Sequence, residues 1–163
     1  MLNKKRRLGW AFFGILLMVA AGCSNKVDKS YLTLKKNAHI ILIGNNLGSR
    51  MMNYGSFETD LQLRYPDSLL YIRNMCDGGN TPGFRPHSAR NTPWAFPGAE
   101  KFQTELANDP PTEGFNEYPD QWITKHKAEI IIAFFGYDES FQEEAGRENY
   151  KAELDAFLNN TLQ

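Results

Sequence analysis

Polar side chains that could take part in ligand binding or catalysis follow two apolar stretches of the sequence. Asn45 and Asn46 come directly after the stretch 38–44, and Asp138 comes shortly after the stretch 129–136. Carboxamide and carboxylate groups offer hydrogen-bonding atoms to a ligand. A neutral carboxamide, however, cannot act as an activated nucleophile. These residue types therefore favour polar recognition of a ligand over covalent catalysis.

Other groups that could do chemistry are few. The three histidines and two cysteines form no cluster with metal-ligand spacing, so neither a metal nor another cofactor is expected. The segment 44–49 has neither P-loop nor dinucleotide-binding spacing. Cys76 has no base nearby in the sequence and is expected to be a buried structural residue. Ser49 lies about one helical turn after Asn46 and is expected to point away from the strand end.

Three short apolar stretches predict the strands that must position these residues. They are 38–44, 69–72 and 129–136, and the last is the most apolar. Helical patterns separate them, and this alternation is typical of an α/β fold with parallel strands and right-handed crossovers. We expect the strand order 2-1-3, with helices on both faces of the sheet.

This strand order also predicts where a ligand binds. The direction of winding reverses between the first and third strands, and α/β proteins bind ligands in the crevice outside the carboxyl ends of such strands. Asn45 and Asn46 follow the first strand and Asp138 follows the third. We expect these side chains to face each other across the crevice.

Apolar residues at helical spacing follow the first strand and predict a single amphipathic helix that ends at Pro66. This stripe consists of Leu47, Met51, Tyr54, Phe57 and Leu61. Further helices are predicted to begin near 119–123 and to cover the apolar positions of 150–162.

The segment 76–118 is rich in proline, glycine and aromatic residues. A loop of this length is either functional or disordered, and its aromatic residues favour an ordered excursion packed over the sheet. Its most basic part, 84–90, contains His87, which is a candidate binding residue. Simple packing of the loop is an equally good interpretation.

The N-terminal segment resembles the signal peptide of bacterial lipoproteins. Basic residues at 4–7 precede an apolar run at 8–22, which is shorter than the roughly 20 residues of a membrane-spanning helix. Small residues then precede Cys23, as in the lipobox of that class. The resemblance implies that 1–22 is a signal peptide, that Cys23 carries a lipid and that the protein is membrane-attached in the bacterial cell envelope. An uncleaved short anchor is the alternative.

Charge argues against a nucleic-acid partner. After the basic N-terminal segment, the chain carries 14 basic and 19 acidic residues, which gives a net charge of −5. A mildly acidic domain is a poor fit for a polyanion. The polar residues 23–37 are expected to form a tether, and 38–163 the domain itself.

Three segments of this domain together resemble the SGNH (GDSL-type) hydrolase superfamily: 43–47, 74–81 and 135–139. Each follows a predicted strand, in the order that the family shows. The resemblance implies a three-layer, flavodoxin-like domain, here incomplete, and an activity on ester or acyl groups. Within it, Gly79 matches the glycine that forms part of the oxyanion hole.

The sequence departs from that family at the positions that carry its chemistry. Asn46 stands where the family has its nucleophilic serine, and Asp138 stands where it has an oxyanion-binding asparagine. A carboxylate at that position would repel a developing oxyanion. None of the three histidines lies in the Asp-x-x-His pattern that supplies the family's base. The resemblance therefore implies an impaired catalyst.

Three hypotheses follow from these observations. The chain is a lipid-anchored SGNH-type hydrolase acting on an ester or acyl group of a carbohydrate-like substrate, with impaired catalysis. Alternatively, it is a non-catalytic surface domain that binds a glycan or a protein partner on the same scaffold. The third hypothesis, compatible with either, is that it is a fragment of a longer lipoprotein.

Overall fold

The structure is a computed structural model, and it describes residues 32–86, 92–107 and 118–163. The predicted signal peptide, Cys23 and His87 lie outside these residues, so the roles assigned to them remain predictions. Residues Leu34–Gln163 form one structural unit, to which the following description applies. Within the described residues, no helix has both the length and the apolar character needed to cross a membrane.

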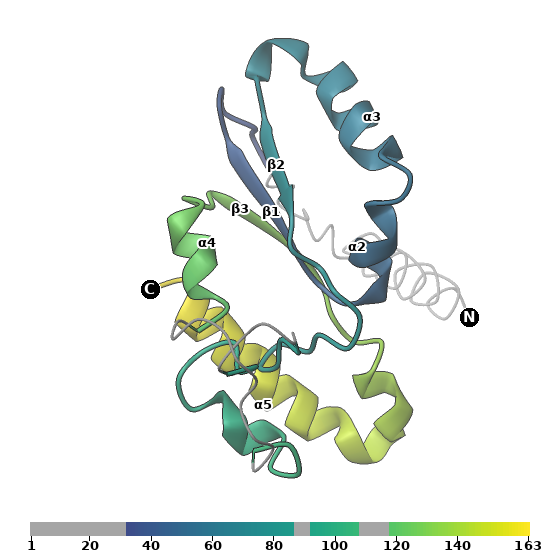
Figure 1. Ribbon diagram of the computed structural model, residues 1–163, viewed down its shortest axis with the longest axis vertical. Helices are drawn as coiled ribbons and strands as arrows, with labels where there is room; N and C mark the ends of the chain where they lie inside the picture. Colours follow the sequence, from purple (N-terminus) through teal and green to yellow (C-terminus); the bar gives the residue numbers. More distant parts are fainter. Residues whose placement is uncertain (1–31, 87–91, 108–117) are drawn as a thin grey trace, which may run out of the picture. The chain divides into compact units, whose positions relative to one another are not determined.

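Three parallel strands form the sheet, in the order β2-β1-β3 (Figure 1). They are β1 (His39–Gly44), β2 (Tyr71–Asn74) and β3 (Ile130–Phe134). The predicted α/β class and the strand order 2-1-3 are confirmed. The second strand begins two residues later than predicted, because a 3-10 turn at Pro66–Ser68 is followed by Leu69 in a left-handed conformation.

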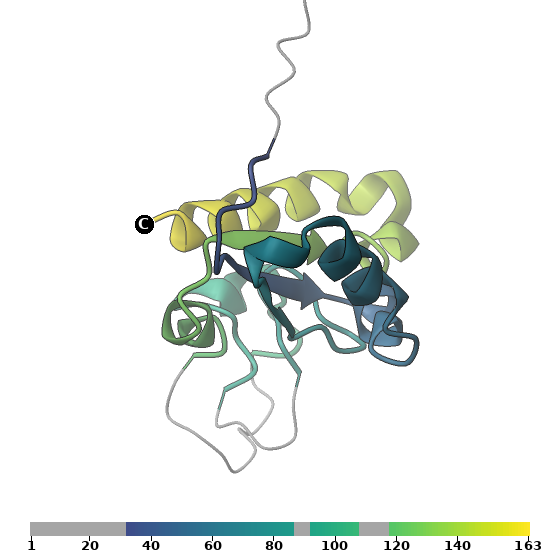
Figure 2. The ribbon, with the colours of Figure 1, turned by 90° about the horizontal axis from the view of Figure 1, so that it is seen from above.

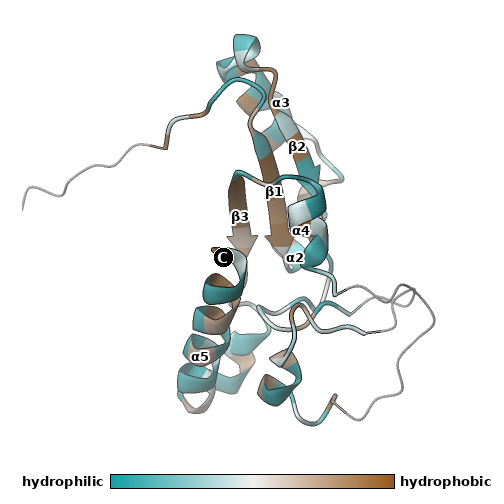
Figure 3. Ribbon diagram, turned by 90° about the vertical axis from the view of Figure 1, so that its left-hand side faces the viewer, coloured by the Kyte–Doolittle hydropathy of each residue, from teal (hydrophilic) through white to brown (hydrophobic). Residues whose placement is uncertain are grey.

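The central strand β1 is buried on both of its faces, which explains its nearly continuous apolar sequence. Ile40 and Leu42 belong to a hydrophobic cluster on one face, and Ile43 belongs to a second cluster on the other. Figure 3 shows β1 and β3 as the most hydrophobic ribbons, surrounded by helices with mixed or hydrophilic surfaces. The sheet is therefore the middle one of three layers.

Two short helices, α2 (Asn46–Met51) and α3 (Ser56–Arg64), lie on the face of Ile40 and Leu42. The prediction of a single helix with one apolar stripe was wrong. Gly55, in a left-handed conformation, precedes α3, and the chain changes direction there. Met51 and Leu61 still pack against the core, whereas Tyr54 is 78% exposed.

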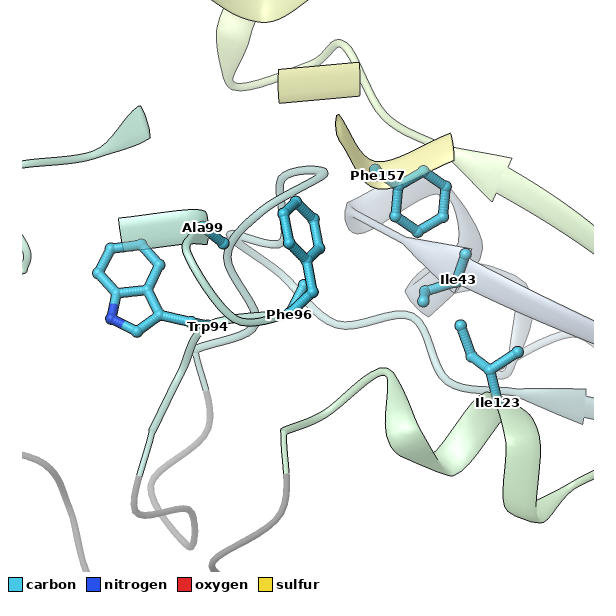
Figure 4. Close-up of a cluster of buried hydrophobic side chains, with 7 residues drawn as sticks. Ile43, Trp94, Phe96, Ala99, Ile123 and Phe157 are labelled. Atoms are coloured by element: carbon cyan, nitrogen blue, oxygen red, sulfur yellow. The ribbon is translucent and has the colours of Figure 1, made fainter. Parts of the chain in front are cut away.

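The opposite face is covered by α4 (Gln121–Lys125), by α5 (Glu143–Thr161) and by parts of the long loop, including a 3-10 turn at Ala99–Phe102. Figure 2 shows α5 running alongside the sheet. Phe157 of α5, Ile123 of α4 and Phe96 of the loop gather around Ile43 of β1 (Figure 4). The described parts of the loop are thus ordered and packed, as predicted.

Buried polar contacts attach this loop to the rest of the domain. The Arg85 guanidinium lies 3.3 Å from the Asp120 carboxylate, and both side chains are almost fully buried. Glu153 of α5 is also buried, and its Oε1 accepts hydrogen bonds from the Thr81 hydroxyl at 2.7 Å and from the Gly83 amide at 2.9 Å. These contacts hold the loop to the helices that follow it in the sequence.

Candidate functional site

A pocket of about 520 Å³ lies at the carboxyl ends of β1 and β3, where the strand order predicts a ligand site. We call it the β1–β3 pocket. One wall comes from the end of β1 and from α2, and the other from β3 and the residues after it. Its lining residues are Asn45, Asn46, Leu47, Arg50, Ala133, Phe134, Phe135 and Tyr137. The lining therefore combines apolar and aromatic surface with two carboxamides and one guanidinium, a composition typical of small-molecule sites.

Asn45 is only 1% exposed, and its carboxamide is committed to internal hydrogen bonds. Its Nδ2 donates to the carbonyl of Asn80 at 3.0 Å. Its Oδ1 accepts from the amides of Asn46 at 2.6 Å and Gly79 at 3.2 Å. Asn45 thus joins the end of β1 to the loop after β2. The Gly79 amide, to which the family resemblance assigns an oxyanion role, here donates to Asn45.

Asn46 is exposed, in contrast to its neighbour. Its side chain forms no hydrogen bond with any other described residue, and it lies over Gly78, where an added Cβ would be 3.0 Å from Asn46 Oδ1. The carboxamide of Asn46 is therefore available to a ligand in the β1–β3 pocket.

Asp138 does not line this pocket. Tyr137 does, and Asp138 instead lines a second, smaller cavity of about 60 Å³, together with Glu139, Tyr150 and Glu153. The structure therefore brings Asn45 and Asn46 together but places Asp138 on another cavity. Cys76 is buried too, and burial raises the pKa of its thiol to about 12, which disfavours the reactive thiolate at neutral pH. Ser49 is half-buried on α2 and is not among the lining residues.

Besides its apolar residues, the described lining of the β1–β3 pocket includes two polar residues that were not predicted as site residues from the sequence, Arg50 and Tyr137. Arg50 lies four positions after Asn46, and residues at this spacing share one face of a helix. This spacing in the sequence could therefore have identified Arg50 as a neighbour of Asn46. Tyr137 could not have been separated from Asp138, because adjacent residues in a turn can point in either direction. Within the described residues, no three His, Cys, Asp or Glu side chains are grouped so that they could hold a metal ion.

The smaller cavity concentrates negative charge. Burial raises the pKa of Glu139, and the nearby Glu153 and Asp138 raise it further, while a hydrogen bond from the Gly136 amide to Glu139 Oε2 at 3.0 Å lowers it. Glu139 Oε1 is buried and has no hydrogen-bond partner among the described residues. The ionised form of Glu139 is therefore disfavoured in the folded protein.

We expect a Glu139→Gln variant to be more stable than the native protein at pH 8. A carboxyl group whose pKa is raised by folding binds its proton more tightly in the folded state, so stability is lost as pH rises above the ordinary pKa of about 4.3. The amide cannot ionise, and its carbonyl can still accept from Gly136. Thermal unfolding as a function of pH measures the effect, which should shrink towards pH 4.

The matched control is Glu105→Gln, since Glu105 is exposed. It should leave the pH profile unchanged. An equal gain in melting temperature for both variants at pH 8 would show that net charge, and not the environment of Glu139, causes the effect.

Comparison of the chain with known protein families, with curated proteins and with solved structures found no match. The resemblance to SGNH hydrolases accordingly remains a prediction from the sequence.

Proposed function

We propose that this chain is an SGNH-hydrolase-like protein that binds a carbohydrate-like ligand in the β1–β3 pocket and does not hydrolyse esters. The observation that carries the proposal is the exposed, unengaged carboxamide of Asn46 at the end of β1, which lines the same pocket as the aromatic side chain of Tyr137. A carboxamide can both donate to and accept from sugar hydroxyls. An aromatic side chain offers apolar surface to the ring of a sugar.

The pocket's composition supports binding without hydrolysis. Among the described residues, its lining includes no serine, cysteine, histidine or acidic side chain, so the commonest nucleophiles and general bases are not among them. The Gly79 amide is engaged by Asn45, and Asp138 lines a different cavity. We include in the proposal membrane attachment in the bacterial cell envelope through a lipid on Cys23, which is supported by the basic and apolar segments that precede that residue.

The purified chain should hydrolyse simple aryl esters no faster than background. Removal of the triad from a complete serine hydrolase leaves about 10³–10⁴-fold catalysis over water, which comes from binding and the oxyanion hole. Here the matching oxyanion groups are also missing or engaged. An Asn46→Ser variant should be equally inactive, because no base would take the serine's proton. Turnover by the native chain that disappears in Asn46→Ala would contradict the proposal.

Binding is tested on the same proteins by thermal shift and calorimetry with a set of neutral and acidic sugars. We expect at least one sugar to raise the melting temperature, and Asn46→Ala to weaken its binding. The control is Asn53→Ala, an exposed residue that does not line the pocket. Failure of every sugar to bind, or equal losses in the two variants, would overturn the assignment.

A further inference from the structure

The charge inside the β1–β3 pocket differs from that of the domain around it. Among the described residues that line it, Arg50 is the only charged one and none carries a carboxylate. The chain beyond the N-terminal segment, by contrast, carries a net charge of −5. The pocket is therefore a local site of positive charge in an acidic domain.

Arg50 also differs from other exposed arginines on the helices. Arg64 of α3 lies 2.8 Å from Asp60, and Arg147 of α5 lies 2.9 Å from Glu144. Arg50 forms no ion pair with any described residue. Its guanidinium thus keeps its five N–H donors for water or for a ligand.

The position of Arg50 brings this cation beside the group that we propose as the sugar-binding carboxamide. Asn46 and Arg50 lie one turn apart on α2, and both line the same pocket. A ligand that contacts Asn46 through a hydroxyl can therefore present an acidic group to Arg50. The side chains of Phe134, Phe135 and Tyr137, which also line the pocket, add apolar surface and one phenol.

We propose that the β1–β3 pocket selects an acidic sugar, one whose ring carries a carboxylate, and that Arg50 binds this carboxylate. This inference rests on the proposed function and names its ligand class. A guanidinium matches the planar geometry of a carboxylate with two parallel hydrogen bonds. A single arginine balances the single charge of a carboxylate, whereas a phosphate monoester carries close to two charges at pH 7. The pocket volume of about 520 Å³ lies within the usual range for small-molecule sites.

The test compares three sugars that differ in one substituent: glucuronic acid, glucose and glucose 6-phosphate. Calorimetry on the full chain should give the tightest binding for glucuronic acid. Arg50→Gln should weaken glucuronic acid binding by about tenfold to a hundredfold, as expected for hydrogen bonds to a charged group, and weaken glucose binding much less. The affinity of the Arg50→Lys variant for glucuronic acid should lie between those of the native protein and Arg50→Gln, because an ammonium keeps the charge but loses the paired geometry.

Arg64→Gln is the matched control, since Arg64 is exposed and lies outside the pocket, and it should behave like the native protein. Equal affinity for glucose and glucuronic acid, or no effect of Arg50→Gln, would overturn the acidic-sugar inference while leaving the proposed function intact. Preferential binding of glucose 6-phosphate would indicate that Arg50 recognises a phosphate and not a carboxylate, and it would also overturn the acidic-sugar inference. If none of the sugars that we test binds, the proposed function itself fails.

Discussion

Replacing Arg85 by alanine should lower the free energy of unfolding by about 3–5 kcal/mol. Arg85 and Asp120 have side chains that are only 3% and 5% exposed, with Nε 3.3 Å from Oδ1. Removing the arginine takes away the cation that lies 3.3 Å from the buried Asp120 carboxylate, and the desolvation cost of that carboxylate is then less well offset. The same change removes the hydrogen bonds that Nη1 donates to the carbonyls of Thr81 and Phe84.

The contacts of the Arg85 side chain with two aromatic rings are also lost in Arg85→Ala, which lowers the stability further. The Arg85 guanidinium lies 5.0 Å from the centre of the Phe135 ring and 5.7 Å from that of Phe157. Cation–π contacts in a desolvated position contribute about 2 kcal/mol. Because Phe135 also lines the β1–β3 pocket, the variant should loosen one wall of the site as well as the loop.

Urea-induced unfolding of three further variants separates the causes. The exposed pair gives the control: Arg64→Ala removes a partner of Asp60 where the side chains are 69% and 62% exposed, and it should change stability by less than about 1 kcal/mol. Asp120→Ala should lower the free energy of unfolding about as much as Arg85→Ala does. The double variant Arg85→Met with Asp120→Leu should recover much of the loss, because both buried charges of this pair are then replaced by apolar side chains. A loss below about 1 kcal/mol for Arg85→Ala would show that the pair does not hold the loop.

The architecture of the sheet was predictable because burial acts on whole stretches of sequence. A strand buried on both faces, such as β1, must be apolar along its length, and the helical segments between strands require parallel crossovers. The attachment of the long loop was not predictable in this way. Thr81 and Glu153 are 72 residues apart, and nothing in either residue type identifies the other as its partner.

In the candidate site, too, the sequence predicts the general position but not the role of each single residue. Asn45 and Asn46 are adjacent, chemically identical and both line the pocket, but the first is buried and held by internal hydrogen bonds, whereas the second is exposed. The backbone turn between β1 and α2 directs the Asn45 side chain inward. There its Oδ1 accepts a hydrogen bond from the Gly79 amide, which belongs to a distant loop. Sequence identifies the position of the crevice through strand order, but not which side chains are free to bind there.

The close approach of β1 and β3 leads to the second large expected effect, at Gly44. This last residue of β1 pairs with Phe134 and has a φ of +126°, which residues with a side chain rarely adopt. An added Cβ would lie 2.5 Å from the carbonyl oxygen of Phe134 and 2.8 Å from its nitrogen. These are backbone atoms, so they cannot move aside as the end of a flexible side chain could.

We therefore expect Gly44→Ala to cost about 4 kcal/mol or more, a large part of the 5–15 kcal/mol that stabilises a typical domain. The matched control is Gly55→Ala. Gly55 also has a positive φ, of +54°, but an added Cβ there would meet no atom within 4 Å, so only the conformational cost of about 1–2 kcal/mol applies. Urea unfolding of both variants gives, as the difference between them, the cost of the contacts with Phe134 together with the greater strain of a side chain at a φ of +126°. Similar losses in the two variants would show that β3 can move away from β1. In that case the β1–β3 pocket, whose walls these strands carry, would be adaptable rather than preformed.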